Sequence, residues 1–180
     1  MKKFLALILA LAMALSLVAC GSNNSNDNSN DNSGTTTKQL RFVTGGESGT
    51  YYGFGSVIAT HATNNAGVSV VALSSDGSKA NVFSLEENEA ELGFCQSDVM
   101  AYAYNGTNIF ADSGKVDCFS VLGALYTEQV QIVTTNPDIK SVADLEGKSV
   151  SVGAPASGVY FNAVDILSAY GIGDLDADGK

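Results

Sequence analysis

Residues 40–55 read LRFVTGGESGTYYGFG, and this stretch indicates how the chain folds. Residues 40–44 are typical of a short strand, and the Gly- and Ser-rich run that follows is typical of a turn. From Thr50 the apolar residues recur at helical spacing to about residue 64. A strand that runs through a short glycine turn into a helix is the basic unit of an α/β fold.

The same unit recurs along the chain. The continuous apolar run at 68–73 predicts a strand that is buried on both faces. Further strands are expected at 92–95, 119–126, 129–135 and 148–153, and further helices at 78–88 (capped by Ser78), 97–104, 141–145 (a single turn) and 157–170, where Ser157 caps the helix and Gly171 ends it. Strands and helices that alternate over short connections predict an α/β fold with a mainly parallel sheet.

The N-terminus indicates export. Lys2 and Lys3 precede an apolar run at 4–19, whose 16 residues are fewer than the roughly 20 that span a membrane. Residues 1–19 are therefore predicted to be a signal peptide. The sequence LVAC at 17–20 resembles the bacterial lipobox, which implies lipidation of Cys20; the alternative is an ordinary signal peptide with an incidental cysteine. Residues 21–39 have no apolar side chain, so residues 20–39 are expected to be a lipidated cysteine and a disordered tether.

The charge excludes several partners. The chain has 9 basic and 19 acidic residues, and loss of Lys2 and Lys3 with the signal peptide leaves a formal charge of −12. Nucleic acid is excluded because its binding needs a basic surface. Electrostatic docking to anionic lipid is excluded for the same reason, so the expected membrane contact is the lipid on Cys20.

Catalytic, metal and cofactor chemistry find little support in the sequence. His61 is the one histidine, so no Ser-His-Asp arrangement is expected, and no Cys/His/carboxylate cluster has metal spacing. The glycine turn matches neither the P-loop nor the dinucleotide motif. We therefore expect a protein that is not an enzyme and that has no cofactor. Cys95 and Cys118 either form a disulfide or remain buried free thiols.

Three loops at the predicted carboxyl ends of strands form the candidate site, at 44–52, 95–98 and 153–158. Each leads into a helix N-terminus, whose free N–H groups and partial positive charge attract an anion such as a carboxylate. Asp98 either caps its own helix or pairs with a ligand ammonium, and Tyr51 and Tyr52 either contact the ligand or pack in the core. Hydroxyl groups are supplied by Ser48, Thr50, Ser97 and Ser157.

At these loops the chain resembles the TAXI family of extracytoplasmic receptors for TRAP transporters. The matching segments are FVTGGESGTYYGFG (42–55), DGSKANVFSLEENEAELGFCQSDVMAYAYNG (76–106) and IKSVADLEGKSVSVGAPASGVYFNAVDIL (139–167). The resemblance implies a periplasmic-binding-protein type II fold, in which two α/β lobes close on a ligand. It places the first lobe at 40–130 and a crossover with a partial second lobe at 131–180, so that the second lobe is incomplete in this chain.

The implied function is to capture a small organic solute, either a carboxylate or an amino-acid-like molecule of the glutamate class. A permease driven by an ion gradient would receive the solute at the extracytoplasmic face of the bacterial cell membrane. The alternative is a lipid-anchored binding protein of an ABC importer.

The resemblance also implies which residues bind the solute. Gly46, Thr50 and Tyr51 match the first ligand loop, Gln96, Ser97 and Asp98 the second, and Ala154, Ser157 and Gly158 the third, while Gly77, Ser78 and Asn81 match a further motif near the cleft. Val159 and Tyr160 stand where the family commonly has a polar or acidic pair. Tyr160 near Tyr51 would give a more aromatic pocket, which favours a flatter or more apolar solute.

Overall fold

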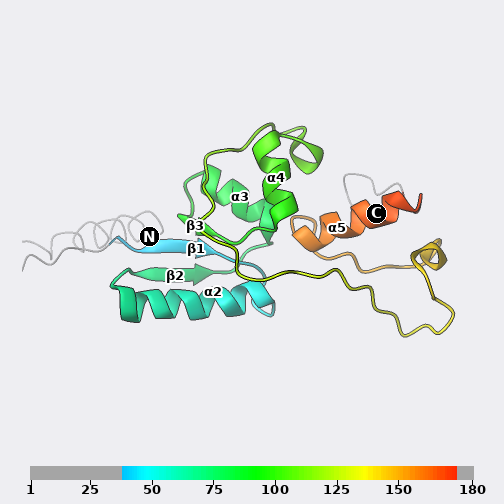
Figure 1. The fold of residues 1–180 in the computed structure, drawn as a ribbon, viewed down its shortest axis with the longest axis horizontal. Helices are drawn as coiled ribbons and strands as arrows, with labels where there is room; N and C mark the ends of the chain where they lie inside the picture. Colours follow the sequence, from blue (N-terminus) through cyan, green and yellow to red (C-terminus); the bar gives the residue numbers. More distant parts are fainter. Residues whose placement is uncertain (1–37, 174–180) are drawn as a thin grey trace, which may run out of the picture. The chain divides into compact units, whose positions relative to one another are not determined.

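A three-stranded parallel sheet organises the part of the chain that the structure, a computed structural model, describes, which is residues 38–173. The central strand is β1 (Leu40–Val43), with β2 (Val70–Leu73) on one side and β3 (Leu92–Gly93) on the other (Figure 1). Leu40 lies opposite Val70, and Phe42 lies opposite Leu92. The predicted α/β fold with a parallel sheet is confirmed.

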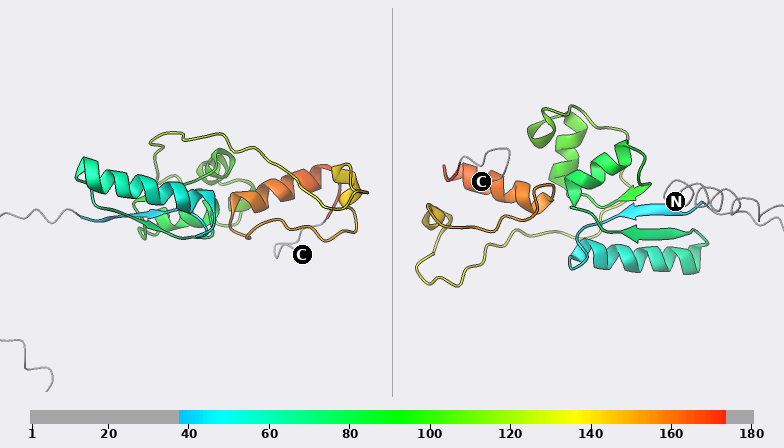
Figure 2. Two further views of the ribbon diagram at one scale, coloured as in Figure 1. Left: turned by 90° about the horizontal axis from the view of Figure 1, so that it is seen from below. Right: turned by 180° about the vertical axis from the view of Figure 1, so that it is seen from behind.

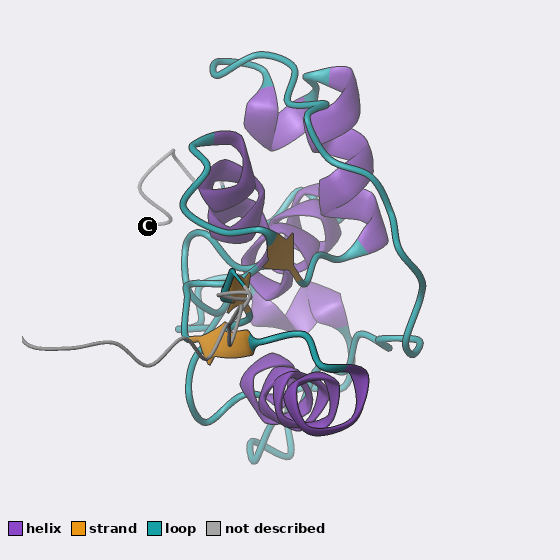
Figure 3. Ribbon diagram, turned by 90° about the vertical axis from the view of Figure 1, so that its left-hand side faces the viewer, coloured by secondary structure: helices purple, strands orange, loops and turns teal. Residues whose placement is uncertain are grey.

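Two helices make the crossovers between these strands. α2 (Thr50–His61) leads from β1 toward β2 and continues as the π-helix η1 (Ala62–Ala66), whereas α3 (Ser78–Glu86) leads from β2 to β3. α2 packs along β2 and β1, and α3 packs against β3. Figure 3 views the strands nearly end-on, with α2 lying beside them.

The strand order defines the switch point of the sheet. The chain leaves β1 for β2 on one side and then returns to β3 on the other side. In open α/β sheets, ligands bind beyond the carboxyl ends of the strands where the order reverses in this way. Here that point lies between the loop after β1 and the loop after β3, which are the first two predicted ligand loops.

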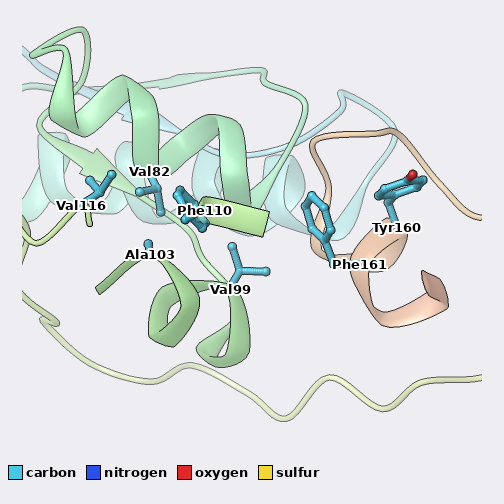
Figure 4. Packing of buried hydrophobic residues seen from close by; sticks show 7 residues of the cluster. All are labelled: Val82, Val99, Ala103, Phe110, Val116, Tyr160 and Phe161. Atoms are coloured by element: carbon cyan, nitrogen blue, oxygen red, sulfur yellow. The ribbon is translucent and has the colours of Figure 1, made fainter. Parts of the chain in front are cut away.

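The main apolar cluster joins two neighbouring helices to the last helix of the described residues. α4 (Ser97–Asn105) packs against α3, the 3₁₀ turn η2 (Asn108–Phe110) follows α4, and α5 (Gly158–Ala169) contributes two aromatic residues. Figure 4 shows the buried members of the cluster: Val82, Val99, Ala103, Phe110, Val116, Tyr160 and Phe161. Burial of these side chains from four elements fixes α5 next to α3 and α4.

Three predicted strands are absent from the described residues. The runs at 119–126, 129–135 and 148–153 have no strand structure (Figures 1 and 2). All residues from 120 to 138 are exposed. A strand exists only when a neighbour accepts and donates its backbone hydrogen bonds, and no strand pairs with these runs between residues 38 and 173. The second sheet that the two-lobe prediction requires is accordingly not formed there.

Two smaller predictions about local structure were also wrong. β2 lies at the edge of the described sheet and its residues are half-buried or exposed, so it is not buried on both faces. Ser78 does not cap α3, because Gly77 is the N-cap and the Ser78 hydroxyl accepts the backbone N–H of Gln96 at 3.1 Å.

The single-turn helix was predicted correctly. It is the 3₁₀ helix η3 (Val142–Leu145), where Asp144 accepts the backbone N–H of Ser141 at 2.8 Å.

The predicted signal peptide, Cys20 and nearly all of the tether lie outside the described residues. Between residues 38 and 173, no helix has the length and apolar character that crossing a membrane requires.

Candidate functional site

A buried asparagine holds the first two ligand loops together. Nδ2 of Asn81, on α3, donates to the carbonyl of Thr44 after β1 at 2.7 Å and to the carbonyl of Phe94 after β3 at 2.8 Å. Its Oδ1 accepts the hydroxyl of Ser75, in the loop after β2, at 2.6 Å. One side chain therefore ties the carboxyl ends of all three strands, which gives the predicted Asn81 a positioning role.

Tyr51 lies where the first two loops meet. Its ring centroid is 5.0 Å from that of Phe94, and its hydroxyl donates to Oε2 of Glu128 over 3.5 Å. Burial, and then the negative charge of Glu128, raise the pKa of Tyr51 above its ordinary value. Tyr51 consequently stays a neutral donor over the physiological pH range. Of the two predicted alternatives, the structure shows packing of the ring against Phe94, and contact with a ligand stays a prediction.

Gln96 connects the second loop to the third. Its Nε2 donates to Oε2 of Glu128 at 2.7 Å and to Oδ1 of Asn162, on α5, at 3.4 Å. Its Oε1 is buried without a hydrogen-bond partner in the described structure and packs on Gly158. A Cβ at Gly158 would collide with this oxygen, so the glycine is what lets the second and third loops approach each other.

Asp98 makes two hydrogen bonds within the protein. Its Oδ1 accepts the backbone N–H of Val99 at 2.8 Å, and its Oδ2 accepts Nδ2 of Asn162 at 2.6 Å. Gln96 is the N-cap of α4, so Asp98 lies in the first helical turn, where a carboxylate favours the helix dipole. Of the two predicted roles for Asp98, the structure shows contact with its own helix and adds a link to α5.

The third loop begins α5 as predicted. The Ser157 hydroxyl accepts the backbone N–H of Tyr160 at 3.2 Å and donates to the carbonyl of Ala154 at 2.7 Å. The backbone N–H of Lys79 donates to the carbonyl of Ala156 at 3.1 Å, which joins this loop to the start of α3. Gly77 has a φ of 107°, and a Cβ there would lie 3.2 Å from the Ser157 Cα. The two loops are therefore in direct backbone contact.

The other predicted ligand residues lie at the rim. Each is solvent-exposed and occurs at or beside a helix N-terminus: Gly46, Ser48, Thr50, Ser97 and Ala154. Gly46 also lines an open depression of about 390 Å³ together with Glu47, Ser74, Ser75 and Asp76. The N-cap residues of α2 and α4 form no side-chain cap, so N–H groups of the first turns remain free for a ligand, except that of Val99, which donates to Asp98.

Sequence reasoning missed Glu128, Tyr126 and Asn162. Glu128 and Tyr126 belong to the exposed extended run, where the sequence predicts strands and gives no ligand motif. Asn162 is four residues after Gly158 on α5, and this spacing puts both on one helix face. That helical spacing was the one signal that could have found Asn162.

Tyr160 and the cysteines correct further expectations. Tyr160 is buried in the apolar cluster with its ring edge-on to Phe161 at 5.2 Å, so it does not widen an aromatic pocket beside Tyr51.

Cys95 and Cys118 are both free thiols, the first half-buried and the second exposed. Burial raises the pKa of Cys95 to about 12, which makes it a poor nucleophile.

Taken together, these residues define a class of protein. A parallel sheet brings hydroxyl, amide and carboxylate side chains to its switch point, beside two uncapped helix N-termini, and this arrangement is typical of α/β proteins that bind a small ligand. Residues 42–180 match the NMT1-like family, and the chain belongs to that family. The family is related to substrate-binding proteins and is generally non-catalytic.

Proposed function

We propose that the protein is an extracytoplasmic solute-binding receptor, which captures a small organic solute of the carboxylate or amino-acid-like class, such as glutamate, for a TRAP-type importer. The observation that carries this proposal is the convergence of Tyr51, Gln96 and Asp98 at the sheet's switch point, in one hydrogen-bonded network with Asn162. Membership of the NMT1-like family supports it.

The site suits binding better than catalysis. The free N–H groups at the starts of α2 and α4 offer a carboxylate the positive ends of two helices. The polar side chains supply hydrogen bonds that fix orientation. Within the described network, no hydroxyl or thiol is paired with a histidine that could activate it, and His61 bonds to Asn65 at the far end of α2.

A TAXI-type receptor would close on its solute. Residues 40–130 would form the first lobe and residues 131–180 would contribute to a second, with the hinge near 129–135. Closure would sequester the solute between the helix N-termini. Small-angle X-ray scattering should show a smaller radius of gyration with a saturating ligand, and an unchanged radius would contradict closure.

The expected partner is a permease driven by an ion gradient. Lipidation of Cys20 would hold the receptor at the extracytoplasmic face of the bacterial cell membrane. The alternative, a receptor for an ABC importer, uses the same kind of site with a different membrane partner. Uptake in vesicles that contain the cognate permease separates the two, because TRAP transport requires the gradient and ABC transport requires ATP.

A thermal-shift screen tests the binding function directly. Purified protein is screened against amino acids, dicarboxylates and aromatic acids, because a ligand that binds only the folded state adds about 2.7 kcal/mol of stability at 100 times its Kd. At least one class should raise the Tm. Tyr51→Ala and Asp98→Ala should weaken the binding that the screen finds, whereas Tyr104→Ala, on the exposed side of α4, should not. Unchanged affinity in both site variants would contradict the site.

A further inference from the structure

The carboxylate of Glu128 is surrounded by neutral donors. Its Oε2 accepts Nε2 of Gln96 at 2.7 Å and the hydroxyl of Tyr51 at 3.5 Å, and its Oε1 accepts the hydroxyl of Tyr126 at 3.2 Å. Of the ion pairs formed between residues 38 and 173, none includes Glu128 or Asp98. The candidate site thus holds two carboxylates whose charge no cationic side chain of the described chain balances.

Aromatic rings lie beside this carboxylate. Tyr51 and Tyr126 both reach Glu128 with their hydroxyls, while the Tyr51 ring packs against Phe94 at 5.0 Å and the Tyr126 ring against Phe54 at 5.3 Å. Both tyrosines turn their hydroxyl groups toward Glu128, so an ammonium group bound to this carboxylate has phenol oxygens beside it that accept further hydrogen bonds.

The lysine of α3 does not provide that cation. Nζ of Lys79 lies 5.7 to 5.9 Å from three ring centroids of the apolar cluster, those of Phe83, Phe110 and Phe161. This cation–π arrangement directs the ammonium group into the cluster. Glu128 is exposed, so water solvates its charge in the free protein and the amine of a ligand has access to it.

A chain of amides fixes which group points at Glu128. Carboxylates accept hydrogen bonds and do not donate them, so Asn162 must present its NH₂ group to Asp98 and its oxygen to Gln96. Gln96 must then present its NH₂ group to both Asn162 and Glu128. Asp98 thereby orients Gln96 through Asn162. Asp98 is half-buried, whereas Glu128 is exposed and accessible to a ligand.

We infer that Glu128, flanked by Tyr51 and Tyr126, recognises a protonated amine on the solute, and that Asp98 is a positioning residue which does not contact that amine. This inference rests on the proposed receptor function and narrows its solute class to molecules that carry an ammonium group. The amine takes the place of the long 3.5 Å contact from Tyr51 and bonds to Glu128 directly. The solute's carboxylate remains free for the helix N-termini.

Matched solute pairs test the inference. Isothermal titration calorimetry compares L-glutamate with glutarate and L-phenylalanine with 3-phenylpropionate, because the members of each pair differ in the amine. The wild-type protein should prefer the amine-bearing member of at least one pair. Glu128→Gln keeps the size of the side chain and removes its charge, so it should lower that preference about 10- to 100-fold, as expected for a charge-assisted hydrogen bond. It should leave the affinity for the des-amino member unchanged or higher.

Further variants separate recognition from structure. Glu87→Gln, an exposed acid just after α3, is the matched control and should keep the wild-type preference. Tyr126→Phe removes the hydroxyl beside Glu128 and should reduce the preference, and Tyr126→Leu should reduce it at least as much. Asp98→Asn should weaken both members of a pair together, since it disturbs Gln96 and not the amine itself.

The outcomes distinguish this inference from the proposed function. If Glu128→Gln retains the preference, or weakens the binding of both members of a pair equally, Glu128 does not recognise the amine. If the wild-type protein binds the des-amino acids as tightly as the amino acids, the inference is wrong and the receptor function stands. If it binds no member of any class screened, the receptor function itself is contradicted, and the inference with it.

Discussion

Nδ2 of Asn81 donates a 2.7 Å hydrogen bond to the carbonyl oxygen of Thr44, and the two residues are 1% and 0% exposed. The contact joins α3 to the end of β1, 37 residues earlier in the chain. Because Phe94 and Ser75 bond to the same side chain, the position of the candidate site depends on one fully buried amide.

Replacing this amide should destabilise the fold. Asn81→Leu has a similar volume but leaves the carbonyls of Thr44 and Phe94 buried without a donor, and each unsatisfied group costs about 1–3 kcal/mol. We expect urea unfolding to show a loss of about 2–5 kcal/mol. Asn105→Leu serves as control, because Asn105 is exposed and makes one bond to the carbonyl of Ala101. A loss below about 1 kcal/mol for Asn81→Leu would contradict the assigned role.

Two glycines should respond in opposite directions to alanine. At Gly158 the added methyl group meets Oε1 of Gln96, so Gly158→Ala should cost about 1–3 kcal/mol and weaken solute binding. At Gly53, within α2, nothing lies within 4 Å of an added Cβ, so Gly53→Ala should stabilise the protein by about 0.5–1 kcal/mol. Chemical denaturation of both variants provides the measurement. Equal effects would mean that the close contact between Gln96 and α5 does not form.

Acid should remove the contribution of Glu91. Hydrogen bonds from the side chain and backbone of Arg41, followed by one from Lys38, lower the pKa of Glu91 from 4.5 to about 2. A carboxyl group with a lowered folded-state pKa stabilises the fold above its unfolded pKa, and this contribution is lost as the pH falls from 4.5 through 2. Glu91→Gln should therefore lower the Tm at pH 7. Plotted against pH, the Tm values of the variant and of the wild-type protein should converge near pH 2.

Added salt and a variant at a second acidic residue serve as controls for the Glu91 measurement. The partners Lys38 and Arg41 are partly exposed, so added salt should shrink the difference at pH 7. Glu86→Gln, at the exposed end of α3, should keep the Tm of the wild-type protein at each pH. A Tm difference between Glu91→Gln and wild type that stays constant from pH 7 to pH 2 would exclude the ion pair as its source.

The two described cysteines should differ in reactivity. With a pKa of about 12, Cys95 holds about one thiolate in ten thousand thiols at pH 8, and its side chain is half-buried. Cys118 is exposed. Iodoacetamide labelling followed by peptide mass spectrometry should show modification of Cys118 well before Cys95, with the difference abolished in denaturant. Similar native rates at the two positions would show that Cys95 is more accessible than the structure indicates.

Local patterns were enough to predict most elements around the sheet. The run LRFVT followed by a glycine turn predicted β1 and the start of α2 at Thr50, and Ser157 was correctly identified as the cap of α5. These features depend on neighbours in sequence: apolar spacing, a capping hydroxyl and a turn. The same reasoning failed at 119–135 and 148–153, because a strand also needs a partner, and the sequence of a run does not state whether one is present.

Part of the candidate site was likewise predictable from local sequence, and part was not. The sequence indicated the loops that contain Tyr51, Gln96 and Asp98, since glycine, hydroxyl and amide residues at strand ends are a local signal. It could not indicate Glu128, which reaches the site from a distant part of the chain, and it marked Asn162 only through its helical spacing from Gly158. It also left open whether Asp98 faced the solute, and the structure shows both of its oxygens bonded within the protein.

What the sequence by itself determined was the α/β class and the parallel sheet. The loops of the candidate site, export and an anchor at Cys20 are predictions from the same sequence. What only the tertiary structure decided was the strand order β2-β1-β3, the convergence of three loops on Asn81 and the presence of Glu128 beside Tyr51. The physical reason is the distance along the chain over which each effect acts. Propensities, caps and turns act over a few residues, whereas the charge balance of a site depends on which distant side chains folding brings within hydrogen-bond distance.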